Sequence, residues 1–427
     1  MAPTIQAPTG RADAMCLPLT AQTAPEIPAA AEPGFDHWLA TMRRIATEVA
    51  APHAARVDAD ARFPQETVDA LRAAGLLSVA VPHSHGGAGL SLLDQAQLCA
   101  VLAQGCGSSA MVFAMHLGQQ ASIVRHRGDS PLFDDYLREL VRQQWLLASI
   151  TSEVGTWGDT RSSICALQPV ADPAGGATPR TWRLTKEATT GSYCGSADAI
   201  LVTCRRDAEA PASDQRLLLV RAGDFTLTQT TTWDTLGMRG TVSPGYRLEA
   251  EAPAEQLLPV PYADIGAMTM VPWTHVLWSA LWWGIAADAH AKAAASVRAQ
   301  ARKQPGHTPP AALRLAELSA ALQTARLHWE GVAREFDALD AQGEAARAAL
   351  TGMGWRLKFN HLKTTMSDTA PKLVHQALQV IGMPAFKNDH PMSLGRHYRD
   401  ALSGALMINN DRIHAGSAAL LTVYKDA

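Results

Sequence analysis

The spacing of hydrophobic and polar residues divides the chain into two helical blocks around a central block of short apolar runs. In the central block, apolar and β-branched runs occur at 199–203, 217–220 and 225–230. Residues that favour turns separate these runs, as at 172–176 and 243–245. Short runs of this kind between turn residues are typical of β-strands. The pattern therefore predicts a β domain over 149–260, inserted between helices.

Both flanking blocks have the spacing of amphipathic or buried helices. Residues 1–34 form a segment rich in Ala, Pro and Thr without an apolar period, which predicts a disordered tail. A Gly-rich loop is expected over 79–90, and Ser91 is a candidate helix cap. The N-terminal helical domain, 35–148, is expected to contain helices over 35–59, 63–76, 91–102, 108–127 and 132–144. The C-terminal domain, 261–427, is expected to form a four-helix bundle from segments 267–303, 309–338, 344–383 and 396–424.

Composition narrows the functional classes. Hydrophobic residues make up 47% and charged residues 18% of the chain, and the net charge of −3 offers no attraction for nucleic acid. The six cysteines show no metal-ligand spacing, which favours reduced thiols in a cytoplasmic protein. No apolar run reaches the ~18–20 residues of a membrane span. The longest, 276–287, is soon followed by Asp288 and predicts a buried helix.

Several motifs occur in the order found in one family. Leu236 to Thr241 reads Leu-Gly-Met-Arg-Gly-Thr, and Lys186 precedes an Ala-Asp-x-x-x-Val segment that ends at Val202. Further motifs are the segment from Arg62 to Ser91, Gln379 to Gly382, and Arg399-Asp400. With these motifs the chain resembles the acyl-CoA dehydrogenase superfamily over about 35–421. The resemblance implies an α+β, mostly α, fold with an N-terminal helical domain, a middle β domain and a C-terminal four-helix bundle.

The resemblance also implies a flavin, FAD or alternatively FMN, and a homodimer or homotetramer in which the bundle of one subunit reaches the flavin of another. The flavin loop of the family corresponds to 152–159 here, although Trp157 and Gly158 replace its usual Gly and Ser. Met383 replaces a second family glycine. The residues implied to contact the cofactor are Ser152, Gly155, Thr156, Ser192, Arg302, Gln379 and Gly382. Without the resemblance, Ser152 and Ser192 would be interpreted as ordinary strand or turn hydroxyls, and Arg302 as a solvated cation at a helix end.

The implied reaction is α,β-desaturation of an acyl thioester, which needs a carboxylate to take the α proton while a hydride passes to the flavin. Most family members carry this Glu after the Arg-Asp motif, where the chain has Ile408 or Asn409, depending on one gap. Other members carry it on the first bundle helix, where Thr274 stands. Neither position holds a carboxylate, so the usual catalytic Glu is missing.

Three explanations for the missing Glu stay open. Asp411 can serve as the base after a small shift in register, although an Asp near a helix start also acts as a cap. A histidine can act as the base near neutral pH, and the candidates are His116, His275 and His414. Alternatively, no α proton is removed, as in superfamily monooxygenases that use reduced flavin and O2. His116, Thr274, His275 and Asn409 would then line a hydrogen-bonding pocket.

The sequence therefore predicts an FAD-dependent oxidoreductase that desaturates an acyl thioester of CoA or a carrier protein. The alternatives are a flavin-dependent monooxygenase and a flavin-binding homologue without turnover. The expected partners are an electron-transfer protein or a flavin reductase. No nucleic acid, metal or membrane partner is expected.

Overall fold

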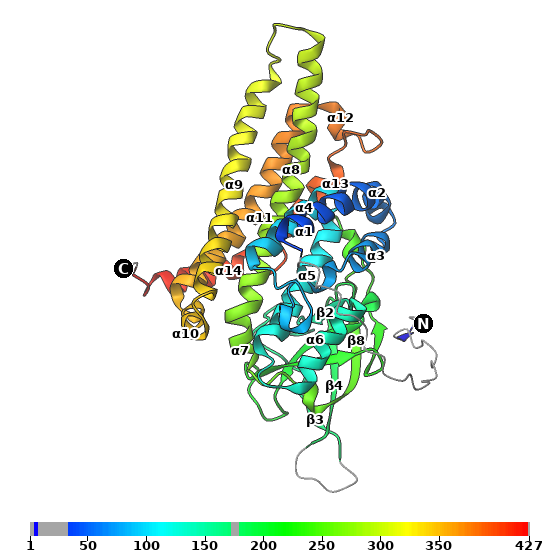
Figure 1. The fold of residues 1–427 in the computed structure, drawn as a ribbon, viewed down its shortest axis with the longest axis vertical. Helices are drawn as coiled ribbons and strands as arrows, with labels where there is room; N and C mark the ends of the chain where they lie inside the picture. Colours follow the sequence, from blue (N-terminus) through cyan, green and yellow to red (C-terminus); the bar gives the residue numbers. More distant parts are fainter. Residues whose placement is uncertain (1–3, 7–32, 172–178, 426–427) are drawn as a thin grey trace, which may run out of the picture.

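The computed structural model describes residues 4–6, 33–171 and 179–425. A long helical hairpin forms one end of the molecule and the β-strands form the other, with α4 and α5 between the strands and the bundle (Figure 1). Helices α4 and α5 both pack on α8, and α5 also contacts β2. This order of helices, strands and helices is the one that the sequence predicts. The predicted turn at 172–176 lies outside the described residues.

The N-terminal helices begin and end close to the predicted positions. The expected helix 35–59 is continuous but contains one wider π turn at Ala46–Ala50. Ser91 caps α4 as predicted, because its Oγ accepts a hydrogen bond from the Asp94 N–H at 3.2 Å and the Asp94 carboxylate accepts the Ser91 N–H. The helices are α1 (Phe35–Ile45), α2 (Ala51–Ala59), α3 (Gln65–Ala73), α4 (Leu92–Gly105), α5 (Gly107–His126) and α6 (Pro131–Gln143).

Two sheets form the β region of the described chain. The larger sheet is antiparallel with the order β1-β7-β8-β4-β3, and the smaller has the order β2-β5-β6, with β2 parallel to β5. Strand β8 alternates buried and exposed residues, whereas β5 is buried along nearly its whole length and is therefore covered on both faces. The strands are β1 (Thr4–Gln6), β2 (Leu147–Ile150), β3 (Gln168–Pro169), β4 (Thr181–Ala188), β5 (Ala199–Arg205), β6 (Gln215–Arg221), β7 (Phe225–Gln229) and β8 (Tyr246–Pro253).

Strand β1 is a departure from the predicted disordered tail. Residues Thr4–Gln6 pair antiparallel with β7, with Ile5 opposite Leu227. The β-branched residues Thr4 and Ile5 favour an extended backbone, and the pairing covers an edge of the sheet. The rest of the tail up to residue 32 lies outside the described residues.

The C-terminal bundle contains three long helices, and two of the four expected segments are broken. The prediction of one helix over 344–383 is wrong between 348 and 352, because Gly352 has an extended backbone (φ −71°, ψ 156°) that ends one helix before the next begins. The bundle helices are α7 (Tyr262–Ile265), α8 (Val271–Lys303), α9 (Ala311–Asp340), α10 (Glu344–Arg347), α11 (Met353–Ile381), α12 (Met383–Phe386), α13 (Gly395–Leu402) and α14 (Asn410–Leu421). The prediction of one helix over 396–424 is wrong between 403 and 409. Ile408 has a φ of 51°, which no right-handed helix accommodates, and Asn409 begins a new helix by capping α14.

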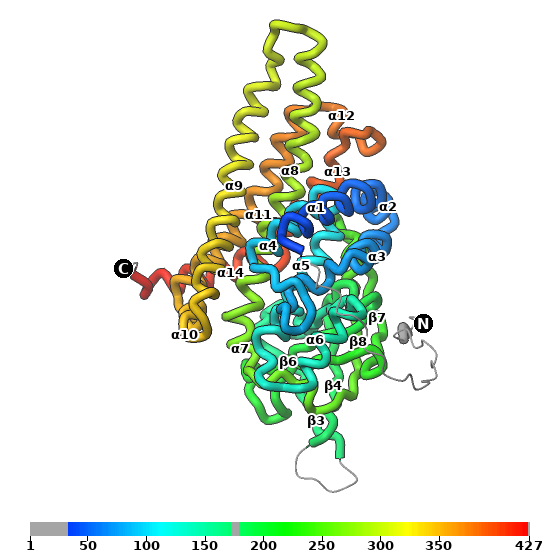
Figure 2. Tube along the Cα trace, in the orientation of Figure 1, coloured from blue at the N-terminus to red at the C-terminus, as the bar shows by residue number. Residues whose placement is uncertain are grey.

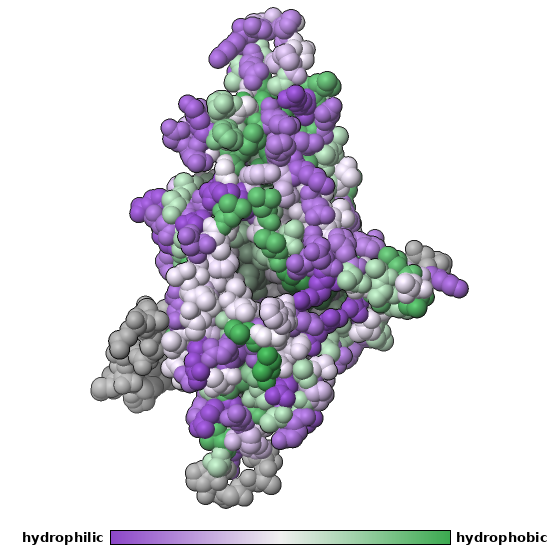
Figure 3. Space-filling model, turned by 180° about the vertical axis from the view of Figure 1, so that it is seen from behind, coloured by the Kyte–Doolittle hydropathy of each residue, from purple (hydrophilic) through white to green (hydrophobic). Residues whose placement is uncertain are grey.

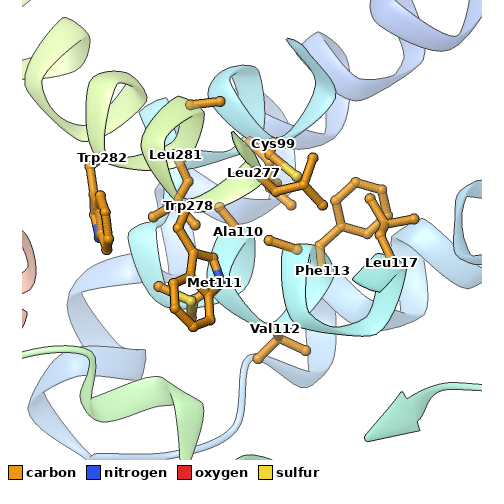
Figure 4. Close-up of a cluster of buried hydrophobic side chains, with 14 of the residues drawn as sticks. Cys99, Ala110, Met111, Val112, Phe113, Leu117, Leu277, Trp278, Leu281 and Trp282 are labelled. Carbon is orange, nitrogen blue, oxygen red and sulfur yellow. The ribbon is translucent and has the colours of Figure 1, made fainter. Parts of the chain in front are cut away.

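The main core lies where α8 crosses α4 and α5. Leu277, Trp278 and Leu281 of α8 face Cys99 of α4 and several side chains of α5 (Figure 4). A Cβ on Gly284 would lie 2.3 Å from the Ala100 carbonyl oxygen, so the crossing of α8 and α4 requires a glycine there.

Segments far apart in sequence meet at the side of this core. Helix α2 lies beside α13 (Figure 2), and Arg399 of α13 donates to the Asp58 carboxylate of α2 at 3.0 Å. Among the described helices, none combines the length and apolar character that crossing a membrane requires.

Candidate active site

A buried ion pair anchors the loop that the sequence predicts to contact the flavin. Lys186 Nζ on β4 donates to Glu153 Oε2 at 3.2 Å, and the two side chains are 0% and 4% exposed. The Glu153 carboxylate also accepts the N–H groups of Ile164 at 3.0 Å and Cys165 at 2.6 Å. Lys186 further donates to the Thr203 carbonyl at 2.7 Å. The pair was not predicted from the sequence, although Lys186 stands at a buried position of a strand that alternates buried and exposed residues, which is a signal for a buried partner.

The predicted contact residues of this loop lie beside the ion pair. Ser152 Oγ donates to the Thr190 carbonyl at 2.8 Å and accepts the Thr190 N–H at 3.0 Å, which ties the loop to the end of β4. Gly155 has a φ of 91°, and Thr156 Oγ1 closes the turn by donating to the Glu153 carbonyl at 3.0 Å. Trp157, which replaces a family glycine in this loop, is 90% exposed.

Ser192 belongs to a chain of hydroxyl groups. Ser243 Oγ donates to Ser192 Oγ at 2.8 Å and lies 2.8 Å from Thr241 Oγ1, while Thr241 donates to the Met238 carbonyl. The chain links the segment after β4 to the Leu236–Thr241 motif. Its half-buried end, Ser192, can donate to or accept from a ligand in the way that a flavin ring requires.

The Leu236–Thr241 motif docks directly on the Arg399-Asp400 motif. The buried Asp400 carboxylate accepts the Met238 N–H at 2.7 Å, and burial raises the pKa of Asp400 to about 6. Arg399 donates to the Leu236 carbonyl at 2.9 Å. A Cβ on Gly237 would lie 2.1 Å from the Arg399 carbonyl oxygen, so only glycine fits. The two motifs are therefore one structural unit that joins the β region to the bundle.

The turn that replaces the family's Glu segment lies at the start of α14. Asn409 is exposed, and its side-chain oxygen accepts the N–H groups of Asp411 at 2.7 Å and Arg412 at 3.4 Å, so this oxygen serves as a helix cap. Asp411 is exposed, and its carboxylate has no partner within the described structure. Arg412 donates to the Trp157 carbonyl at 2.6 Å, which connects α14 to the flavin loop.

His116, His275 and Thr274 are buried. His116 is 0% exposed, accepts the Leu147 N–H at 3.0 Å and lies 2.7 Å from the Leu77 carbonyl, so both ring nitrogens are occupied. Burial lowers its pKa to about 4. Because backbone groups occupy both ring nitrogens, His116 has no free nitrogen in this structure to act as the base or to face a ligand in the expected hydrogen-bonding pocket.

Thr274 and His275 stand on the same turn of α8. The Thr274 hydroxyl donates to the Met270 carbonyl at 2.7 Å, within its own helix. His275 Nδ1 donates to the Phe359 carbonyl at 3.1 Å, and burial lowers the pKa of His275 to about 3, with nearby Lys363 contributing. His275 is therefore neutral near pH 7. His414 lies in α14 and is exposed.

Three predicted cofactor residues lie away from the flavin loop of their own chain. Arg302 is exposed near the tip of the α8–α9 hairpin, at the end of the molecule opposite the strands (Figure 1). Gln379 is exposed, and its amide lies 3.1 Å from His375 Nε2. Gly382 has a φ of 78° and ends α11. The structure therefore does not bring these three residues together with Ser152 and Ser192 within one chain.

A second feature near the motifs is a groove of about 850 Å³ between α2, the 235–239 loop and α13. It is lined by Arg239, Lys292, Arg396 and Arg399 among others. Each cation has a carboxylate within 4.0 Å, at Asp234, Asp288, Asp400 and Asp58 respectively. The positive charges of the groove are therefore balanced by the protein itself. Within the described residues, no group of three or more His, Cys, Asp or Glu side chains is arranged to hold a metal ion.

The donor set around the flavin loop fits a flavin. The groups concerned are the hydroxyls of Ser152 and Ser192, which bond to Thr190 and Ser243, and the guanidinium of Arg412, which bonds to the Trp157 carbonyl. Hydroxyl and amide donors suit a flavin ring, and a guanidinium suits a pyrophosphate.

On the rear face, hydrophobic side chains form a broken stripe down the middle of an otherwise hydrophilic surface (Figure 3).

Comparisons with known proteins agree with this architecture. The model of the acyl-CoA dehydrogenase N-terminal domain matches residues 36–144, and the model of the C-terminal domain matches residues 267–414. The putative acyl-CoA dehydrogenase YdbM of Bacillus subtilis (strain 168) is 24% identical over 380 residues, which cover 86% of this chain and 91% of YdbM.

Two solved structures share the fold. Butyryl-CoA dehydrogenase from Megasphaera elsdenii superposes with a TM-score of 0.75 at 18% identity, covering 93% of this chain and 100% of that one. Dibenzothiophene monooxygenase (TdsC) from Paenibacillus sp. A11-2 superposes with a TM-score of 0.74 at 20% identity, covering 92% and 98%. The two family models together match more than half of the chain and flank its strands. The chain therefore belongs to the acyl-CoA dehydrogenase superfamily of flavoenzymes.

Proposed function

We propose that the protein binds FAD between the loop 151–159 and the start of α14, and that it desaturates an acyl thioester of CoA or a carrier protein. The observation that carries the proposal is the contact between these two elements, in which Arg412 donates to the Trp157 carbonyl at 2.6 Å. Two predicted flavin contacts, Ser152 and Ser192, come from the sheet side of this region. When bound, FAD would accept the hydride from the β carbon of the substrate.

Asp411 is the proposed base. It is the carboxylate nearest in sequence to the expected Glu position, and no hydrogen bond or ion pair within the described structure occupies it. As the second residue of α14 it lies at the positive end of the helix dipole, which favours its ionised form. An ionised carboxylate can take an α proton, provided that the substrate reaches it.

Arg302, Gln379 and Gly382 are proposed to contact the flavin of a second copy. They are exposed or solvent-facing and remote from Ser152 within one chain. A homodimer or homotetramer would place them beside a partner's cofactor. The two electrons would then leave through a separate electron-transfer protein.

A flavin-dependent monooxygenase is the second candidate, with FAD or FMN as its flavin. The observation that favours it is the lack of a carboxylate at 408 and 409, where Ile408 and the capping Asn409 stand. Such an enzyme would bind flavin that is already reduced, or a partner flavin reductase would reduce its flavin. It would need no base at this position. It would also retain the fold shared with TdsC.

One experiment separates the two candidates. The purified protein, reconstituted with FAD, is mixed without oxygen with a panel of acyl-CoA and acyl-carrier-protein thioesters while the flavin spectrum is recorded. Bleaching of the oxidised band supports desaturation. A band that persists with every thioester contradicts it, and oxygen consumption after separate reduction of the flavin then tests the monooxygenase. Failure to bind FAD or FMN contradicts both.

A further inference from the structure

A fully buried lysine holds the turn before α14. Lys363 of α11 is 0% exposed, and its Nζ donates to the Ile408 carbonyl at 2.7 Å and to Asn410 Oδ1 at 2.6 Å. Burying an ammonium group costs free energy unless acceptors surround it. Burial lowers the pKa of Lys363 to about 8, against the favourable charge of Asp368. Both of these acceptors, the Ile408 carbonyl and Asn410 Oδ1, belong to the turn 408–410.

The backbone that Lys363 holds is strained. Ile408 has a φ of 51°, in the left-handed region that β-branched residues rarely enter. Such a conformation persists only when surrounding contacts enforce it. The hydrogen bond from Lys363 to the Ile408 carbonyl directly fixes the orientation of the following peptide unit.

Asn410 extends the contact into a small network. Its Nδ2 donates to Ser367 Oγ at 3.0 Å and to Asp368 Oδ1 at 3.1 Å, while its Oδ1 accepts from Lys363. The first residue of α14 is thereby attached to α11 through three side chains. On α8, the neutral ring of His275 lies close enough to Lys363 for the ammonium charge to lower the pKa of His275.

We propose that Lys363 is a positioning residue that fixes the turn 408–410 and, through it, the start of α14. The start of α14 carries Asp411 and Arg412, and Arg412 reaches the loop at Trp157. The inference rests on the proposed function in one respect, that the flavin lies beside this turn. Lys363 itself touches neither substrate nor cofactor in this assignment.

The test compares two tethers between α11 and α14. Lys363→Met removes the tether at the start of α14. Asn360→Leu removes a matched tether three residues earlier on α11, where Asn360 Nδ2 donates to Ser417 Oγ at 3.0 Å near the other end of α14. Amide hydrogen exchange of peptides spanning 405–415 is measured by mass spectrometry on the full chain, and FAD affinity is measured by titration.

We expect Lys363→Met to accelerate exchange in 405–415 about tenfold or more and to weaken FAD binding about tenfold. Asn360→Leu should leave exchange in 405–415 near the wild-type rate. Equal exchange in both variants would overturn the proposal. Faster exchange with unchanged FAD affinity would support the role of Lys363 in the turn and count against the proposed flavin position. If Lys363→Met does not fold, Asn410→Leu removes one of the two contacts of Lys363 with the turn, and exchange in 405–415 should then rise by a smaller factor; an unchanged rate would overturn the proposal.

A double-mutant cycle tests the strain directly. Ile408→Gly permits the positive φ without strain, so the turn needs less help from Lys363. In the Ile408→Gly background, Lys363→Met should accelerate exchange less than threefold. An undiminished tenfold effect there would show that Lys363 does not oppose strain at Ile408, and would overturn that part of the proposal.

Discussion

Removing one member of the Glu153–Lys186 pair is the most informative perturbation of the site. In Lys186→Met the apolar stem is largely kept, but the Glu153 carboxylate stays 4% exposed without its cation. Only the N–H groups of Ile164 and Cys165 then remain as partners of the carboxylate. The loop that follows Glu153 carries the predicted flavin contacts. We therefore expect both stability and flavin affinity to fall.

The magnitude follows from burial. Removing one partner of a buried ion pair typically costs about 3–5 kcal/mol, whereas an exposed pair contributes about 0–1 kcal/mol. Arg183 provides the matched control, because it lies on the same strand as Lys186 but pairs with Glu251 at 55% and 53% side-chain exposure. Arg183→Met should therefore cost less than about 1 kcal/mol.

The assay is urea unfolding of the apoprotein, followed by FAD titration of each variant under folding conditions. The single variants Lys186→Met and Glu153→Gln and their combination form a cycle. Residues in contact should show a coupling of about 0.5–3 kcal/mol, so the double variant should lose less stability than the two single losses together. Additive losses, or a Lys186→Met loss as small as that of Arg183→Met, would refute the reasoning.

Three further predictions concern other parts of the site. Gly237→Ala should lower the free energy of unfolding by about 1–3 kcal/mol, measured by heat or urea, because its Cβ would overlap the Arg399 carbonyl. Gly266→Ala is the control and should not destabilise the protein, because no atom lies within 4 Å of its added Cβ. Equal effects of the two substitutions would contradict the docking of the two motifs. His116 has a folded pKa of about 4, below its unfolded value of about 6.5, so its contribution to stability is lost as pH falls through this window. Between pH 6.5 and 4, the free energy of unfolding should therefore fall by on the order of 3 kcal/mol more in the wild-type protein than in His116→Gln. The same pH dependence in both proteins would argue against a buried neutral imidazole. Asp411→Asn should slow anaerobic flavin reduction by about 10²–10⁴-fold without changing stability, and an unchanged rate would exclude Asp411 as the base.

The periodicity of the sequence predicts the fold well, because each long element buries a regular stripe. The prediction fails at two bundle segments: the expected helix 344–383 is interrupted between 348 and 352, and the expected helix 396–424 is interrupted between 403 and 409. The second interruption contains Ile408, which has a positive φ. No local pattern marks this residue, since isoleucine normally avoids a positive φ. The break depends instead on Lys363, which lies 45 residues earlier on another helix.

The site shows the same division between local and distant information. Motif order identifies the loop at Ser152 and the Arg399-Asp400 segment, because these are contiguous in sequence. The ion pair of Glu153 joins residues 33 positions apart, so its existence depends on tertiary packing. The burial of His116 could not be predicted for a related reason: its partners are backbone groups of Leu77 and Leu147, in distant segments, which a sequence does not mark.

Strain in the backbone bears on whether the site is built for chemistry. Five of the seven non-glycine residues with positive φ in the described part of the chain lie in the site segments: Trp157, Tyr193, Met238, Val242 and Ile408, with φ between 42° and 53°. Conformations of this kind typically cost about 1–3 kcal/mol each and persist where the surroundings enforce them. Here buried ion pairs and hydrogen bonds enforce them from both the sheet and the bundle. Strained conformations of this kind concentrate at active sites and ligand-binding loops, where they hold the site in one arrangement before the ligand arrives.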